Sequence, residues 1–440
     1  ISDRAEPRES LRANTVFYRG LESACVLLSS QQLDKFRNNE PVHQETLNKG
    51  MRGAYLVSTR LQLVPGQMRS WQLVADVEQS QSSVVALKKQ LEDPRTIEEH
   101  IASSIDQGAD NLARIMARSD GFQVTAEENT CAHHYANTVF NVLRGGIFND
   151  QYRISVSDFR ATVKWFNHKL YQDHADWLEN LPESPDFFRL QALIAERDDF
   201  QLDRLGLEYL PITFGRRHGD PSRPWNHFAI RIRDEDGNPL LSYQGNWRDI
   251  FQNWEALGFS YPEFVESMIA KFVNASTMDG HNPYRITKEG IDWEVEEPDN
   301  PWSNIGYWGD HQIIYLQKLL EMSHQFHPGR LAGLLHRPIF CYANVPYRIK
   351  PFDALLKDPK STVEYDDRLA RCIEQRIREN GADGKLVLDE NGLVYQVNLL
   401  EKLLVTLLAK LGNLVIDGGI WLNTQRPEWN DANNALVGHG

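Results

Sequence analysis

The sequence has 440 residues, of which 41% are hydrophobic, 10% aromatic and 25% charged, and its formal net charge is -14 at pH 7. The aromatic content excludes an intrinsically disordered chain, and the negative charge argues against a nucleic-acid partner, which would need a basic surface. A mean hydropathy of -0.50 and the lack of any apolar run of about eighteen residues exclude a membrane-spanning protein.

The four cysteines, Cys25, Cys131, Cys341 and Cys372, stand far apart and form no CxxC pair. We therefore expect free thiols in a reducing compartment, and we place the protein in the cytoplasm. No P-loop, GxGxxG, GxSxG or HExxH motif occurs, so no bound cofactor and no metal are expected. The chain opens on Ile1 without a signal-peptide pattern, and we expect it to be part of a longer protein.

The first part of the chain is predicted to form strands. Residues 55–64 and 70–76 alternate apolar and polar side chains, and Pro65-Gly66 between them is typical of a turn. These strands are too short for an independent sandwich, so we expect a β-extension packed on something else. Residues 80–118 follow with apolar side chains at helical spacing, as in a connecting pair of helices.

From about residue 127, helical segments alternate with long connections rich in aromatic residues, glycine and proline. We expect helices over residues 132–144, 157–180, 185–193, 247–257, 261–276, 308–326, 365–380 and 396–414. Residues 399–411 form the longest apolar stretch and are predicted to be a buried helix. A hairpin is expected over 228–242, and a long loop over 277–304, which in a compact domain is usually functional.

Tryptophans gather in the second half of the chain, where eight of the eleven lie at or after Trp225. Several stand beside acids, arginines or amides instead of aliphatic residues. An indole face stacks on the apolar face of a sugar ring, while carboxylates and amides bind its hydroxyls. The grouping favours a carbohydrate site, although each tryptophan taken alone is more typical of a core.

Two of the polar and aromatic segments precede helices. Arg248 and Asp249 could bind sugar hydroxyls; alternatively, Asp249 caps its helix and Arg248 pairs with a nearby acid. Asp310 is either the N-cap of an apolar helix or, together with Trp308, part of a cleft.

The third segment, residues 418–436, crowds Glu428, Trp429, Asn430 and Asp431 together with little apolar filling. A carboxylic acid beside aromatic faces is poorly solvated when ionised, and its pKa rises as a general acid requires. The alternative is an exposed acidic turn.

The most specific residues of the three segments are Trp247, Arg248, Asp249 and Gln252, then Asp310, then Trp429, Asn430, Asp431 and Asn434. Together they resemble the inverting disaccharide phosphorylases, the cellobiose and chitobiose phosphorylases of glycoside hydrolase family ninety-four. The resemblance implies a mainly α fold, an (α/α)6 six-hairpin toroid of which this chain holds a part. Residues 1–78 would then be the C-terminal part of a β-sandwich, 79–122 a helical linker, and 123–440 the first part of the catalytic barrel.

The resemblance also implies the role of each residue. Asp431 would protonate the glycosidic oxygen, and Arg248 and Asp249 would hold the sugar at the non-reducing end, with Trp429 beside it. The remaining residues expected to bind substrate are Trp308, Asp310 and Glu428.

We therefore expect an enzyme that cleaves or forms a glycosidic bond with inversion. The favoured reaction is phosphorolysis of a β-linked gluco-disaccharide or oligosaccharide, with inorganic phosphate as co-substrate. No nucleic-acid or membrane partner is expected, and a homodimer is compatible with the sequence. Two alternatives stay open: a non-catalytic barrel that binds carbohydrate, and an inverting hydrolase, which needs a second carboxylate about 6.5–9.5 Å from the acid.

Overall fold

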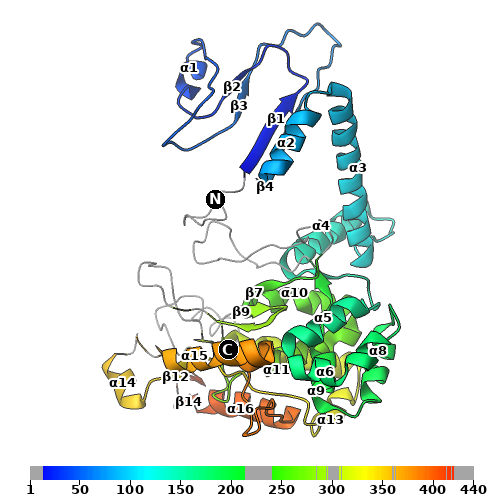
Figure 1. Cartoon of the computed structure of the whole chain (residues 1–440), viewed down its shortest axis with the longest axis vertical. Helices are drawn as coiled ribbons and strands as arrows, with labels where there is room; N and C mark the ends of the chain where they lie inside the picture. The colour runs from blue at the N-terminus through cyan, green and yellow to red at the C-terminus, as the bar shows by residue number, and fades with distance from the viewer. Residues whose placement is uncertain are drawn as a thin grey trace. The chain divides into compact units, whose positions relative to one another are not determined.

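The computed structural model describes residues 13–213, 240–283, 285–293, 295, 307–308, 310–358, 361, 363–412, 414–417 and 419–420 (Figure 1). Most of the hairpin expected over 228–242, and the segment with Glu428, Trp429 and Asp431, lie outside these residues. The chain divides into two compact units, Ile1–Asp110 and Asn111–Gly440. The domain limits expected at 78 and 122 stay predictions.

The first unit is built on a ribbon of two antiparallel strands, β1 (Ala13–Arg19) and β4 (Gln72–Gln79), in which Phe17 pairs with Val74. A second pair joins β2 (Cys25–Leu27) to β3 (Leu56–Ser58), and a short helix, α1 (Leu33–Arg37), lies between them in sequence. The strands found in the two segments that flank the Pro65-Gly66 turn, β3 and β4, therefore do not pair with each other. Each has found a partner strand nearer the N-terminus, because pairing in sheets depends on the side-chain faces and not only on the nearest turn.

Two helices follow, as the periodicity predicted. Ser80 caps α2 (Gln81–Gln90) by accepting a hydrogen bond from the Ser83 N–H at 3.1 Å. Helix α3 (Pro94–Arg118) begins with a proline, which suits the first helical position because that residue needs no N–H partner. No helix in the described part of the chain is long and apolar enough to cross a membrane.

The second unit is mainly helical, which confirms the expected fold class; the partial six-hairpin toroid stays a prediction. Its helices are α4 (Glu128–Gly145), α5 (Val156–Phe166), α6 (His168–Asp173), α7 (Ala175–Glu179), α8 (Phe187–Ala195), α9 (Phe200–Glu208), α10 (Trp247–Ser260), α11 (Val265–Asn274), α12 (Asp310–Phe326), α13 (Arg330–Leu334), α14 (Phe352–Lys357), α15 (Asp367–Asn380) and α16 (Leu399–Leu411). Its short strands are β5 (Ile147–Phe148), β6 (Ile212–Thr213), β7 (Gln244–Asn246), β8 (Asn282–Pro283), β9 (Arg285–Thr287), β10 (Gly290–Asp292), β11 (Tyr307–Trp308), β12 (Tyr347–Ile349), β13 (Val363–Tyr365), β14 (Leu414–Val415) and β15 (Gly419–Ile420).

Some expected elements differ in their limits. The helix expected over 157–180 is three helices, because Asn167 leaves helical geometry and caps α6 by accepting the Leu170 N–H at 2.9 Å. Trp308 belongs to strand β11 and precedes its helix instead of beginning it. The loop expected over 277–304 contains β8, β9 and β10, each too short for periodicity to reveal.

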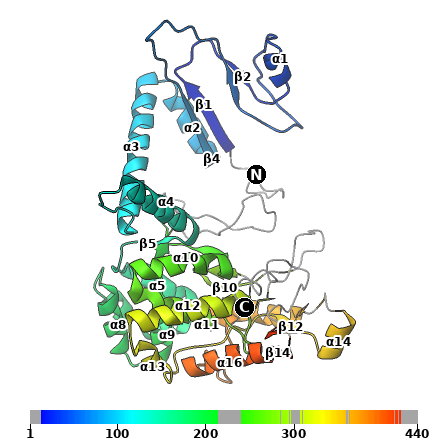
Figure 2. The ribbon, with the colours of Figure 1, turned by 180° about the vertical axis from the view of Figure 1, so that it is seen from behind.

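The core of the second unit surrounds α11, every residue of which is buried. Helices α9 and α12 pack against it, and α10 packs against α12 (Figure 2). Helix α10 also contacts α11 through the rings of Trp247 and Phe251, which both meet Phe272. Aromatic rings fill the interior: Phe148 stacks on Phe264 with ring centroids 4.0 Å apart, and Trp254 is fully enclosed.

The orientation of helix α16 differs from the orientation that the sequence predicted. The stretch is helical as predicted, but its buried side chains include Lys402, Thr406 and Lys410, while Leu404 and Leu408 are exposed. Spacings of four residues place the two lysines and the threonine on one face of the helix. That face points inward, against the prediction that the leucines would be buried.

Candidate functional site

Two strand pairs share one segment of the chain. On β9, Arg285 pairs with Asn246, the last residue of β7. On β8, Asn282 pairs with Trp308, the last residue of β11. Asn282 and Arg285 stand three residues apart, a separation that spans at most about 11 Å of chain. Through this segment the backbones of Asn246 and Trp308 lie at most about 20 Å apart, which is the chain length plus two cross-strand spacings.

Helices α10 and α12 both begin directly after these strands, the first at Trp247 and the second at Asp310. The structure thus connects two segments that the sequence assigned to substrate binding, the one with Arg248 and Asp249 and the one with Trp308 and Asp310, to opposite ends of residues 282–285. The N-terminus of a helix carries partial positive charge and free N–H groups, which favour anions and other acceptors. The structure describes the backbones of Arg248, Asp249, Trp308 and Asp310 but not their side chains.

Glu428, Trp429 and Asp431 lie beyond the described residues, so whether they share a cleft with Arg248 and Asp249 stays a prediction. In the part of the chain that is described, no group of His, Cys, Asp and Glu side chains could hold a metal ion.

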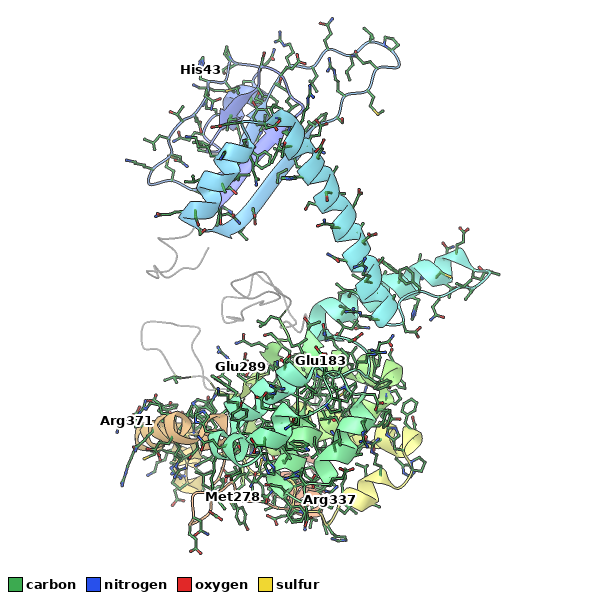
Figure 3. All side chains as sticks on the ribbon, turned by 45° about the vertical axis from the view of Figure 1, so that its right-hand side comes forward. His43, Glu183, Met278, Glu289, Arg337 and Arg371 are labelled. Carbon is green, nitrogen blue, oxygen red and sulfur yellow. The ribbon has the colours of Figure 1, made fainter. Side chains whose placement is uncertain are left out.

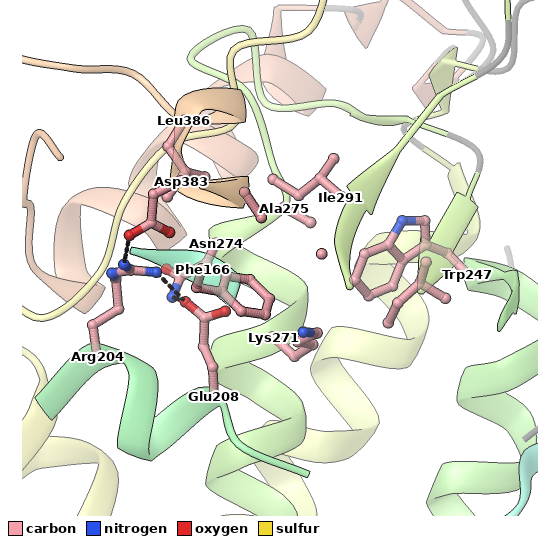
Figure 4. Close-up of a pocket in the computed structure, with 13 residues that line it drawn as sticks. Phe166, Arg204, Glu208, Trp247, Lys271, Asn274, Ala275, Ile291, Asp383 and Leu386 are labelled. Atoms are coloured by element: carbon pink, nitrogen blue, oxygen red, sulfur yellow. Dashed lines mark hydrogen bonds and ion pairs between the residues drawn. The ribbon is translucent and has the colours of Figure 1, made fainter. Parts of the chain in front are cut away.

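A small cavity lies behind the start of α10, and Trp247 forms one of its walls (Figure 4). Its charged and amide lining comes from Arg204, Glu208, Lys271, Asn274 and Asp383. The cavity has a volume of about 20 Å³, which is enough for one water molecule. It is too small for a sugar ring, so we regard it as the support of the site and not as the place where substrate binds.

Charged and amide side chains behind the cavity form a continuous network that links the start of α6, α9, α11 and the turn 382–385. Arg204 on α9 donates to Asp383 Oδ2 at 2.5 Å and to Glu208 Oε1 at 3.4 Å. Asn274 on α11 donates to the same Glu208 oxygen at 2.6 Å, and Asn167 donates to Asp383 Oδ2 at 3.0 Å. Figure 4 shows the Arg204 guanidinium between the two carboxylates. The network ties α9 and α11 to the turn that carries Asp383.

Burial alters the protonation of these groups. It raises the pKa of Asp383, and the neighbouring Arg204 offsets only part of that change. Burial acts against the charge of Arg204 too, but Asp383 and Glu208 outweigh it and raise the pKa of the guanidinium, which stays charged. Burial lowers the pKa of Lys271, with Glu208 opposing the shift.

Aromatic packing fixes the start of α10. The indole of Trp247 is 5% exposed and lies 5.3 Å from the Phe251 ring and 5.5 Å, edge to face, from the Phe272 ring of α11. Its ring N–H has no acceptor among the described residues. Trp247 is thus a wall of the site, and the adjacent Arg248 and Asp249 follow it in the first helical turn.

Sequence reasoning missed the buried network. Its members come from positions as distant as Asn167, Arg204 and Asp383, and no pattern in one sequence links them. The one available signal was the pair Arg204 and Glu208, four residues apart among leucines, since two opposite charges on an otherwise apolar helix face can be buried as a pair.

Residues 148–211 match the model of glycoside hydrolase family 149 insertion domain 1. The matched stretch holds α5 to α9, and therefore Asn167, Arg204 and Glu208 of the buried network. The match supports a carbohydrate-active enzyme of the glycoside hydrolase or phosphorylase type. It does not support family ninety-four specifically, the family named by the resemblance. No curated protein matches the chain.

Proposed function

We propose that the protein is a glycan phosphorylase that cleaves and forms β-linked gluco-oligosaccharides with inversion. The match of residues 148–211 to glycoside hydrolase family 149 carries the proposal, because members of that family are glycan phosphorylases. The attachment of the starts of α10 and α12 to the same short segment, 282–285, is compatible with the proposal, since helix N-termini bind hydroxyls and phosphate oxygens.

In the proposed reaction a phosphate oxygen attacks the anomeric carbon from the face opposite the leaving group. The bond between that carbon and the glycosidic oxygen breaks, and Asp431 gives its proton to the departing oxygen. Arg248 and Asp249 hold the sugar at the non-reducing end, and Trp429 stacks beside it. Trp308, Asp310 and Glu428 complete the substrate site. Phosphate is the nucleophile, so no carboxylate base is required.

The test is a product analysis on the full-length protein. It is incubated with a panel of β-linked gluco-oligosaccharides, with and without inorganic phosphate, and the products are identified by NMR. We expect an α-configured sugar 1-phosphate that forms only when phosphate is present. Free sugar released equally in both arms would instead make the protein a hydrolase, and no turnover of any member would overturn the proposal.

A further inference from the structure

The two buried lysines of α16 have a use that the proposed chemistry does not assign. Lys402 is 0% exposed, and its ammonium donates to the Ser276 carbonyl at 3.1 Å and lies 3.5 Å from the centre of the Tyr342 ring. Lys410 is 1% exposed and donates to the Gly280 carbonyl at 3.3 Å. Both lysines thus reach the same short turn, residues 276–282.

This turn connects the core to the strand segment of the candidate site. It begins where α11 ends and runs into β8, where Asn282 pairs with Trp308. The Thr277 N–H donates to the His281 carbonyl at 2.9 Å, which closes the turn on itself. Because the carbonyl oxygens of Ser276 and Gly280 each accept a hydrogen bond from a lysine, movement of the turn away from α16 would leave a buried lysine Nζ without that acceptor.

The helix approaches the turn very closely at Gly280. A Cβ placed on this glycine would lie 2.6 Å from the Ala409 Cβ and 2.9 Å from the Val405 carbonyl oxygen. Its φ of +76° is also a conformation that side-chain-bearing residues rarely adopt. Because Gly280 has no side chain, the turn can lie directly against α16, close enough for Lys402 and Lys410 to reach its carbonyl oxygens.

Burying two lysines costs free energy unless each finds a partner, and exposing the leucines of the same helix gains nothing. The turn favours the inward lysines, because Lys410 donates to the Gly280 carbonyl and Lys402 is a second donor to the Ser276 carbonyl, which also accepts the Ala343 N–H at 3.0 Å; leucine could donate to neither. Met278 of the turn is 60% exposed and lies at the surface (Figure 3), while Ser276, Gly280 and His281 are buried.

We propose that Lys402 and Lys410 are positioning residues that clamp the 276–282 turn and thereby hold the Trp308–Asp310 segment in place for substrate. The proposal rests on the proposed function for its kinetic consequence, while the clamp itself can be tested without any activity.

The closing experiment compares Lys402→Met and Lys410→Met with Thr406→Val in the full-length protein. Thr406 lies on the same buried face between the lysines, but its hydroxyl donates to Lys402 O within its own helix at 3.1 Å. Hydrogen exchange of peptides covering residues 276–283 and 307–312 is measured for each variant, together with KM and kcat for the oligosaccharide that the wild type uses.

We expect both methionine variants to speed exchange in these two peptides about tenfold or more and to raise KM about tenfold with little change in kcat, while Thr406→Val leaves both unchanged. Unchanged exchange in a folded methionine variant would overturn the clamp. Faster exchange with an unchanged KM would overturn the link to substrate. If the wild type has no activity, the proposed function fails and the exchange data alone decide the clamp; if Lys402→Met does not fold, Lys410→Met carries the test.

Discussion

The side chain of Arg204 is 1% exposed, and its charge is stabilised by the carboxylates of Asp383 and Glu208 instead of by water. Removing two opposite charges from water is expensive, and the attraction between them returns that cost only when the geometry is good. The 2.5 Å contact with Asp383 Oδ2 is close, but Asp383 Oδ1 is buried without a hydrogen-bond partner among the described residues, so the cost is only partly offset. The ion pair as a whole therefore contributes little to the free energy of unfolding. Removing only one of its partners is strongly destabilising, because the other charge is left buried without a counter-charge.

Asp383→Asn should lower the free energy of unfolding by about 3–5 kcal/mol, because Arg204 would lose its closest counter-charge in the interior. The control is Glu179→Gln, which makes the same chemical change in the partly exposed pair of Glu179 and Arg160 and should cost less than about 1 kcal/mol. Urea unfolding of both variants measures the difference. Equal losses of unfolding free energy in the two variants would show that burial does not determine how much the pair of Arg204 and Asp383 contributes to stability.

Asp431 is the proposed proton donor, so Asp431→Asn should lower turnover of the natural oligosaccharide about a hundredfold or more. Substrates with a good leaving group need less protonation and should lose less. Steady-state kinetics of the full-length protein on both substrate types provide the measurement. Near-normal turnover by Asp431→Asn, with loss of turnover in Glu428→Gln, would exchange the roles of these two acids.

Lys402 should make stability depend on pH in an unusual direction. Burial lowers its pKa well below the ordinary value of 10.5, and Cys341, Glu401 and Glu208 are the titratable groups that oppose the shift. Between the folded and the unfolded pKa the unfolded chain binds more protons, so stability rises with pH across that window. We expect the free energy of unfolding of the wild type to rise relative to that of Lys402→Met as the pH increases toward the ordinary lysine pKa of 10.5. Parallel pH profiles from urea unfolding would contradict this.

At the scale of elements, α16 shows what a single sequence can and cannot predict. The helix itself follows from a long run of good helix formers. Its orientation does not follow from the sequence, because leucine is normally buried and lysine exposed. The carbonyls of Ser276 and Gly280, which accept hydrogen bonds from the two lysines, lie more than a hundred residues away in the sequence, so no local pattern indicates these contacts. The start of α10 was predictable from local signals, whereas its connection to Trp308 through residues 282–285 depends on strand pairs two or three residues long.

The contact between α16 and the turn can be tested from the other side with Gly280→Ala. The matched control is Gly329→Ala, since Gly329 also has a positive φ, +89°, but has open space around the position of a Cβ. Both variants carry the backbone cost of about 1–2 kcal/mol, and only Gly280→Ala must also displace Ala409 and the Val405 carbonyl. We expect Gly280→Ala to be less stable than Gly329→Ala by at least about 1 kcal/mol in urea unfolding. A smaller difference would mean that α16 can shift freely.

At the scale of the whole molecule, two surface properties oppose each other. The net charge of -14 favours separation of the molecules in solution. The outward face of α16 does the opposite, because it presents a stripe of partly exposed leucines: Leu400, Leu404, Leu407, Leu408 and Leu411. Contiguous apolar surface of this kind promotes association. Salt screens the charge but not the apolar attraction, so association should grow with ionic strength.

Replacing Leu404 and Leu408, which are 44% and 61% exposed, with glutamine should therefore reduce self-association at high salt without destabilising the fold. Each substitution is expected to change the free energy of unfolding by no more than about 0.5 kcal/mol, as at other surface positions. Leu399→Ala is the contrasting variant, because Leu399 on the same helix is 0% exposed and should cost about 2–5 kcal/mol. Light scattering across a salt series and urea unfolding give the two measurements. A loss of several kcal/mol in the glutamine variant would show that the leucine face is buried in the folded protein, and the inward orientation of Lys402 and Lys410 would then need another explanation.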